Sequence, residues 1–114
     1  MATSILKSLG IYEKVHSTTL NDDVRFFKIW KVGFVLMPAI ASRQWTAYET
    51  IVVCDIPSAF QGAYYTTTNL TGSNRTDCIR GICNQSSNEK IGAYNPGGAI
   101  TVGTTPTVML IVYP

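Results

Sequence analysis

The sequence predicts an all-β domain, and its composition carries that prediction. Of the 114 residues, 34 are β-branched (9 Val, 11 Ile and 14 Thr) and 12 more are aromatic. Such side chains suit the pleated, half-buried surface of a sheet. No stretch shows the sustained 3.6-residue periodicity of an amphipathic helix. The length fits a single domain that buries a core without disulfide or metal staples.

Turn signals divide the chain into eight or nine short strands, which is typical of a β-sandwich or barrel. The expected strands cover residues 11–20, 25–31, 33–37, 45–55, 63–69, 78–83, 90–94, 99–102 and 107–113. A bend at residues 31–33 separates the second strand from the third. The clearest hairpin is predicted for residues 90–102, where two apolar runs flank Asn95-Pro96-Gly97-Gly98. We expect the last strand in the middle of a sheet or beneath another subunit, because residues 108–112 are continuously apolar.

Residues 1–10 are expected to form a stalk-like segment ahead of a sandwich that spans residues 11–114. Residues 3–10 can form one or two helical turns, with Ile5, Leu6 and Leu9 on one face and Gly10 at the end. A helix this short is not stable alone in water. The segment therefore frays, docks on the domain or bundles with copies of itself.

Charge is scarce in this sequence. Charged residues make up 14% of the chain, against about 25% in typical soluble domains, and the net charge is +2. The surface must then be covered by neutral polar side chains or by another subunit. We expect no nucleic-acid partner, because Arg25, Lys28 and Lys31 interleave with aromatic residues but are not segregated on one strand face. The sequence contains no run of 18 apolar residues, so we expect no membrane insertion.

Catalysis and metal binding find little support. The chain has seven acidic residues and a single histidine, His16, and it lacks the spacings of catalytic and cofactor motifs. Cys54, Cys78 and Cys83 do not form a metal-binding pattern. We therefore expect a protein that is not an enzyme and has no cofactor or metal. Cys54 is expected to be a buried thiol, whereas Cys78 and Cys83 are either two reduced thiols or a bridge across a tight turn.

A saccharide-binding site needs aromatic rings that stack on sugar faces and polar side chains that bond hydroxyls. The candidates are Arg43, Trp45, Tyr48, Tyr64, Tyr65, Asn74, Arg75 and Asp77. For Trp45, and more so for Trp30, packing in the core or at a subunit contact competes with this role. Tyr64 and Tyr65 are adjacent on an expected strand, so we expect them on opposite faces, with one of them exposed or at an interface.

The order of elements from about residue 24 to residue 114 carries a resemblance. A glycine interrupts the aliphatic and aromatic strand of residues 25–36, Ile56-Pro57 follows an apolar run, a Gly-Gly turn joins two later strands, and the chain closes on a strand with Tyr113. This order resembles the C-terminal head domains of bacteriophage tail fibres and baseplate receptor-binding proteins. Only residues 1–10 precede the head, where a fibre has a long shaft, and no binding residue of the family shares a motif here.

The resemblance implies a jelly-roll-like antiparallel sandwich that assembles as a homotrimer. It also implies a protein that recognises saccharide on the host cell surface, such as a polysaccharide, and that is located in the virion after assembly in the host cytoplasm. With the few acidic residues of the chain, we expect this recognition to be non-catalytic. The alternative is a structural virion protein, such as a decoration protein, a fibre tip or an assembly module, that binds only protein.

Overall fold

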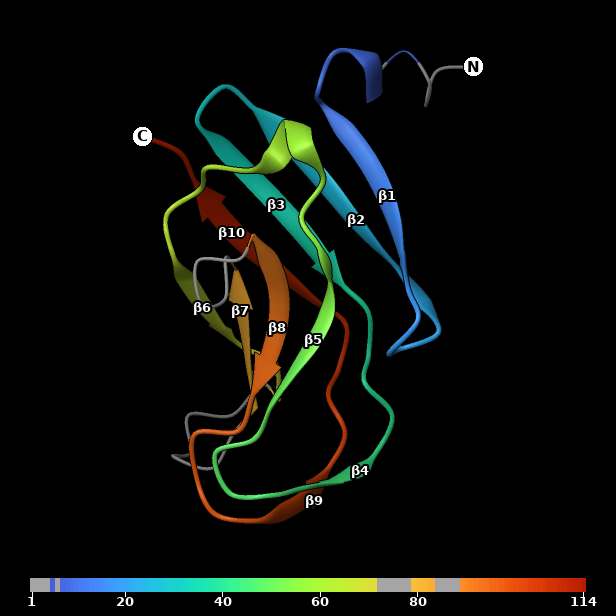
Figure 1. The fold of residues 1–114 in the computed structure, drawn as a ribbon, viewed down its shortest axis with the longest axis vertical. Coiled ribbons are helices and arrows are strands. Elements are labelled where there is room, and N and C mark those ends of the chain that lie inside the picture. Colours follow the sequence, from blue (N-terminus) through green and yellow to red (C-terminus); the bar gives the residue numbers. More distant parts are fainter. Residues whose placement is uncertain (1–4, 6, 72–78, 84–88) are drawn as a thin grey trace.

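The computed structural model describes residues 5, 7–71, 79–83 and 89–114, and within these ranges the chain forms ten β-strands and one 3-10 turn, η1 (Ser58–Phe60) (Figure 1). The first four-stranded sheet has the order β1 (Tyr12–Ser17), β2 (Asp22–Ile29), β3 (Val32–Met37), β10 (Thr107–Val112). The second has the order β5 (Thr50–Asp55), β8 (Lys90–Tyr94), β7 (Arg80–Cys83), β6 (Thr66–Asn69). The short strands β4 (Arg43–Trp45) and β9 (Ile100–Val102) pair with each other.

The predicted fold class, an all-β antiparallel sandwich, is confirmed. All of the described strand pairs are antiparallel. Strands β6, β7 and β8 follow one another as neighbours, and β5 lies beside β8, which is a Greek-key arrangement. The core lies between the two four-stranded sheets, where Phe26 and Met109 of the first meet Ile91 and Ala93 of the second. Phe60 of η1 closes this core against Phe26, with ring centroids 5.5 Å apart.

The helical turn predicted near the N-terminus is confirmed for the residues that the structure describes in this segment. Residues 5, 7 and 8 are helical, and the backbone N–H of Leu9 donates to the carbonyl of Ile5 at 3.1 Å. Gly10 follows with φ = 70°, a conformation in which glycine is not strained. Ile5 and Leu9 are exposed, so this turn does not contribute them to the core.

The bend between β2 and β3 lies one residue earlier than predicted. Ile29 pairs with Val32, so Trp30 and Lys31 form a two-residue turn, with Trp30 at φ = 57°. Gly33 lies inside β3 instead of at the bend. A Cβ atom on Gly33 would stand 2.8 Å from the carbonyl oxygen of Phe27 and from a side-chain atom of Ile111. The glycine therefore permits close packing within the sandwich.

The single strand predicted for residues 45–55 is wrong, because a turn divides it into β4 and β5. Tyr48 has φ = 59°, and the backbone N–H of Glu49 donates to the carbonyl of Thr46 at 3.2 Å. The Glu49 carboxylate accepts a further hydrogen bond from the backbone N–H of Thr46 at 2.9 Å. This side chain replaces the usual glycine or proline signal, so the turn was not recognisable from composition.

The hairpin predicted for residues 90–102 is also wrong, because β8 pairs with β5 and β7 whereas β9 pairs with β4. Both edges of β8 are thus occupied. Between β8 and β9 the buried Asn95 side chain donates to the carbonyl of Thr46 at 2.9 Å and to that of Gly98 at 3.0 Å. These bonds hold the connection against the β4–β5 turn and direct the chain away from β8.

The last strand lies at a sheet edge and not in the middle of a sheet. Among the described strands β10 pairs with β3, while residues ahead of β6 approach its other side. The backbone N–H of Tyr64 donates to the carbonyl of Val112 at 2.9 Å, and the hydroxyl of Thr66 donates to that of Leu110 at 3.2 Å. The two sheets are therefore linked along this seam. At the opposite seam the hydroxyl of Thr19, after β1, donates to the carbonyl of Val52 in β5 at 2.9 Å.

Candidate functional site

The predicted saccharide-binding residues fall into separate places. Arg43, Trp45 and Tyr48 lie in β4 and the turn after it, at the lower end of the molecule in Figure 1. Tyr64 and Tyr65 lie between η1 and β6, in the upper half of the same view, so the structure does not bring the tyrosines together. The three further candidates lie outside the described residues: Asn74, Arg75 and Asp77.

Tyr64 and Tyr65 are both exposed, at 58% and 61%. The expectation that they point to opposite faces of a strand was wrong, because β6 begins only at Thr66 and strand alternation does not reach them. Tyr48 is exposed at 67%. Trp30 is 82% exposed, which excludes the core position that was considered for it. The other position considered, a contact with another subunit, stays a prediction.

Trp45 belongs to the core and supports Arg43 instead of facing solvent. Its side chain is fully buried, and its indole N–H donates to the carbonyl of Val102 at 3.2 Å. The Arg43 guanidinium lies over the indole, 4.4 Å from the ring centroid, a distance at which the cation is attracted to the ring face. The ring that was a candidate for stacking on a sugar therefore stacks on an arginine.

Glu49 fixes the other end of the same guanidinium. Arg43 Nη2 donates to Glu49 Oε2 at 3.0 Å, and both side chains are partly buried. This hydrogen bond is the largest cause that lowers the pKa of Glu49, and the backbone N–H of Thr46 is the next. Glu49 therefore stays ionised at neutral pH, and the pair holds Arg43 in one orientation.

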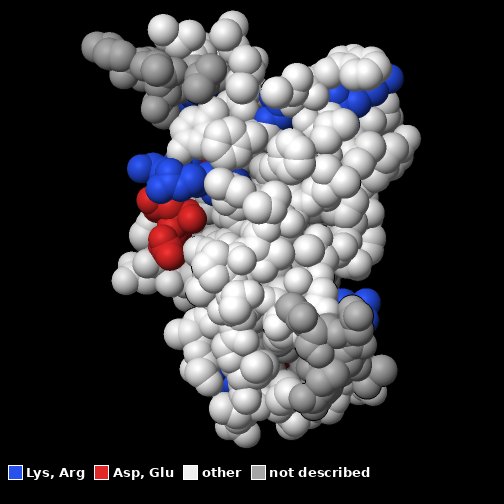
Figure 2. Space-filling view, turned by 180° about the vertical axis from the view of Figure 1, so that it is seen from behind, with Lys and Arg blue, Asp and Glu red and all other residues white. Residues whose placement is uncertain are grey.

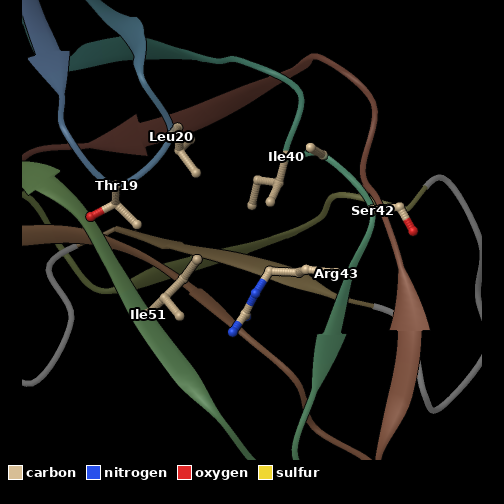
Figure 3. A pocket seen from close by; sticks show the side chains of 7 residues that line it. Thr19, Leu20, Ile40, Ser42, Arg43 and Ile51 are labelled. Atoms are coloured by element: carbon tan, nitrogen blue, oxygen red, sulfur yellow. The ribbon is translucent and has the colours of Figure 1, made fainter.

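A pocket of about 270 Å³ opens beside this arginine. Its wall combines apolar and polar side chains from the β1–β2 connection, the segment ahead of β4, β4 itself and β5: Thr19, Leu20, Ile40, Ser42, Arg43 and Ile51. Figure 3 shows the Arg43 side chain extending from β4 toward Ile51, with its guanidinium turned away from Ile40. Within the described residues, Nη1 of Arg43 is buried and has no hydrogen-bond partner.

A buried donor without a hydrogen-bond partner costs stability. The pocket is slightly smaller than the sites of drug-sized ligands, which start at about 300 Å³. Its volume has room for one small ring. Sequence reasoning found Arg43 but missed the other lining residues, because three separated stretches of the chain supply the pocket and no local pattern links Thr19 to Ile51.

A second hollow of about 330 Å³ continues beyond Thr19 along the seam between β1 and β5, where His16 and Asp55 line it. His16 Nδ1 lies 2.9 Å from Asp23 Oδ1, and this hydrogen bond is the largest cause that lowers the pKa of Asp23. The described residues contain no group of three or more His, Cys, Asp or Glu placed to hold a metal ion.

The described cysteines are buried free thiols. Burial is the first cause that raises the pKa of Cys54 to about 12 and that of Cys83 to about 11. Neither is a thiolate at neutral pH, so neither is placed as a nucleophile. Cys83 is not bridged, and Cys78 lies outside the described residues.

Comparison of the chain with protein-family models, with curated proteins and with solved structures found no match. None of the helical residues that can be described forms a segment long and apolar enough to cross a membrane.

Proposed function

We propose that this chain is a non-catalytic receptor-binding head that recognises host cell-surface saccharide, as the heads of bacteriophage tail fibres do. The observation that supports the proposal is the pocket beside Arg43, whose guanidinium is held in place by Glu49 and Trp45. The resemblance in element order and the sandwich fold agree with this role. In such a virion protein the head is the homotrimeric end of a fibre or baseplate.

The pocket fits one sugar residue that carries an oxygen acceptor. Leu20, Ile40 and Ile51 supply an apolar surface for the C–H face of a ring. Arg43 supplies the donor, and hydrogen bonds from a charged donor are stronger than those between neutral groups. A carboxylate on the sugar is the best acceptor for a guanidinium, so an acidic saccharide is the preferred ligand.

The state of Glu49 beside the pocket supports recognition without chemistry. In typical glycoside hydrolysis the general acid is a carboxyl group that keeps its proton near neutral pH. Glu49, the carboxylate bonded to Arg43, has a lowered pKa and is occupied by three donors on Arg43 and Thr46. It therefore orients the arginine instead of donating a proton.

The test is a saccharide-binding measurement with a matched pair of variants. Purified protein is applied to an array of acidic and neutral bacterial polysaccharides, and Arg43→Gln is compared with Arg80→Gln, which removes the same charge from an exposed position on β7. We expect the wild type and Arg80→Gln to bind an acidic glycan and Arg43→Gln to lose at least tenfold in affinity, with circular dichroism unchanged. Equal binding by both variants would contradict the site.

A structural virion role, in which the chain binds only protein, is the second candidate function. It is favoured by the extent of exposed apolar surface on the first sheet, where Val108 and Leu110 are each at least half exposed. In that case the glycan array stays blank for every variant, while the protein co-purifies with a larger particle.

A further inference from the structure

The outer face of the first sheet, formed by β2, β3 and β10, is apolar. Register places the outward side chains in rows that cross the strands: Phe27, Phe34 and Leu110 share one row, and Ile29, Val32 and Val112 share the next. The inward side chains alternate with these, as Val35, Met109 and Ile111 do, and they are buried in the core. Both faces of this part of the sheet are therefore apolar, although one of them is in water.

The outer face leaves several large apolar side chains exposed. Phe34 is 42% exposed, Leu110 50%, Val108 55% and Ile29 77%. Since a large side chain presents on the order of 150 Å² when free, these residues with Val32 and Val112 leave on the order of 500 Å² of apolar surface in water. Figure 2 views the molecule from this side and shows an uncharged surface over most of it, with charged side chains near its margins.

One end of the outer face carries an aromatic anchor. Trp30, in the β2–β3 turn next to Ile29, is 82% exposed and has φ = 57°. Lys31 Nζ lies 5.2 Å from the centroid of its ring. Exposed tryptophans beside apolar patches are typical centres of protein interfaces, and a stable interface covers about 800 Å² on each partner. The outer face and Trp30 together approach that area.

We infer that the outer face of β2, β3 and β10, with Trp30 at its end, is covered by another copy of this chain. The two rows nearest the β2–β3 turn contain no ionisable side chain, whereas Arg25 lies at the margin of the next row with Leu36 and Val108. Two sheets can pack face to face about 10 Å apart. A copy of the same chain offers the same apolar rows in turn, as a two-fold interface requires, and a neighbour in a closed ring can cover them as well. The low charge of the whole chain agrees with a surface that is partly hidden by copies of itself.

The test measures mass in solution by size-exclusion chromatography with light scattering. We expect the wild type to have two or three times the chain mass of 12.5 kDa. Leu110→Glu and Phe34→Thr should shift the protein to a single chain mass, whereas Val52→Glu, an exposed valine on the other sheet, should leave the mass unchanged. A wild type that stays at one chain mass up to its solubility limit, or association that persists in both variants, would overturn the inference.

A second measurement covers the case in which the variants do not fold. Acrylamide quenching of tryptophan fluorescence in the wild type reports on Trp30, because Trp45 is already fully buried. On dilution from the associated state we expect quenching to increase at least twofold as Trp30 becomes accessible. Quenching that does not depend on concentration, while the mass changes, would place the contact elsewhere. The result does not depend on saccharide binding, so this inference and the proposed saccharide recognition fail separately.

Discussion

Replacement of Asn95 by alanine tests how the candidate site is held together. Asn95 is fully buried, and its side chain makes three hydrogen bonds: Nδ2 donates to the carbonyls of Thr46 and Gly98, and Oδ1 accepts from the backbone N–H of Gly97 at 3.1 Å. The Thr46 bond ties the β8–β9 connection to the turn that carries Glu49, and Glu49 in turn holds Arg43.

The expected loss follows from these bonds. Each contributes about 1 kcal/mol, and partners left buried without a bond add to the cost, so Asn95→Ala should lower the free energy of unfolding by about 3 kcal/mol. For a chain of this length that corresponds to a fall in Tm of about 12 °C. Urea and thermal unfolding, followed by circular dichroism, measure both quantities.

Gln44→Ala is the matched control, because Gln44 is exposed on β4 beside the same site, and it should change the free energy of unfolding by less than about 0.5 kcal/mol. A loss below about 1 kcal/mol for Asn95→Ala would refute the view that this side chain fixes the β4–β5 turn.

Three further predictions concern packing and pH. Gly33→Ala should destabilise the fold by at least about 2 kcal/mol in urea unfolding, because its Cβ would meet the carbonyl of Phe27 at 2.8 Å; a neutral result would disprove that contact. Tyr113→Phe should cost about 1 kcal/mol, since the tyrosine hydroxyl donates to the carbonyl of Phe60 at 2.6 Å, and a variant as stable as the wild type would show that the bond contributes nothing. In the native state the pKa of Cys54 is raised from the ordinary 9.0 to about 12, and that of Cys83 to about 11. Because the thiols of the unfolded chain ionise first, the contribution of these two cysteines to the free energy of unfolding should be constant below about pH 9 and should decline between pH 9 and pH 12. Iodoacetamide at pH 8 should likewise label these thiols only after unfolding, and rapid labelling of the native protein would contradict their burial.

The sequence contained enough information to predict the fold class, because strand preference is a summed property of many residues. It was insufficient where a single tertiary contact decides the path of the chain. Asn95-Pro96-Gly97-Gly98 is a strong local turn signal, yet the bonds of the Asn95 side chain to Thr46 and Gly98 direct the next strand to β4 instead of β8.

The candidate site was predictable in part. Arg43 was identified for its chemistry, and it does line a pocket. Trp45 was selected for the same chemistry, but the structure buries it beneath the guanidinium, an outcome that depends on the pairing of β4 with β9. The alternating exposure of residues 108–112 was hidden from the sequence because both of their faces are apolar, so periodicity does not distinguish a covered face from an open one.

The most direct test of the proposed function is an NMR titration of the ¹⁵N-labelled wild type with the acidic saccharide that binds best on the array. We expect the chemical-shift changes to concentrate on the amides of Thr19, Ser42, Arg43 and Ile51, which surround the pocket. Changes confined to the segment of Tyr64 and Tyr65, or no changes at saturating saccharide, would contradict binding beside Arg43.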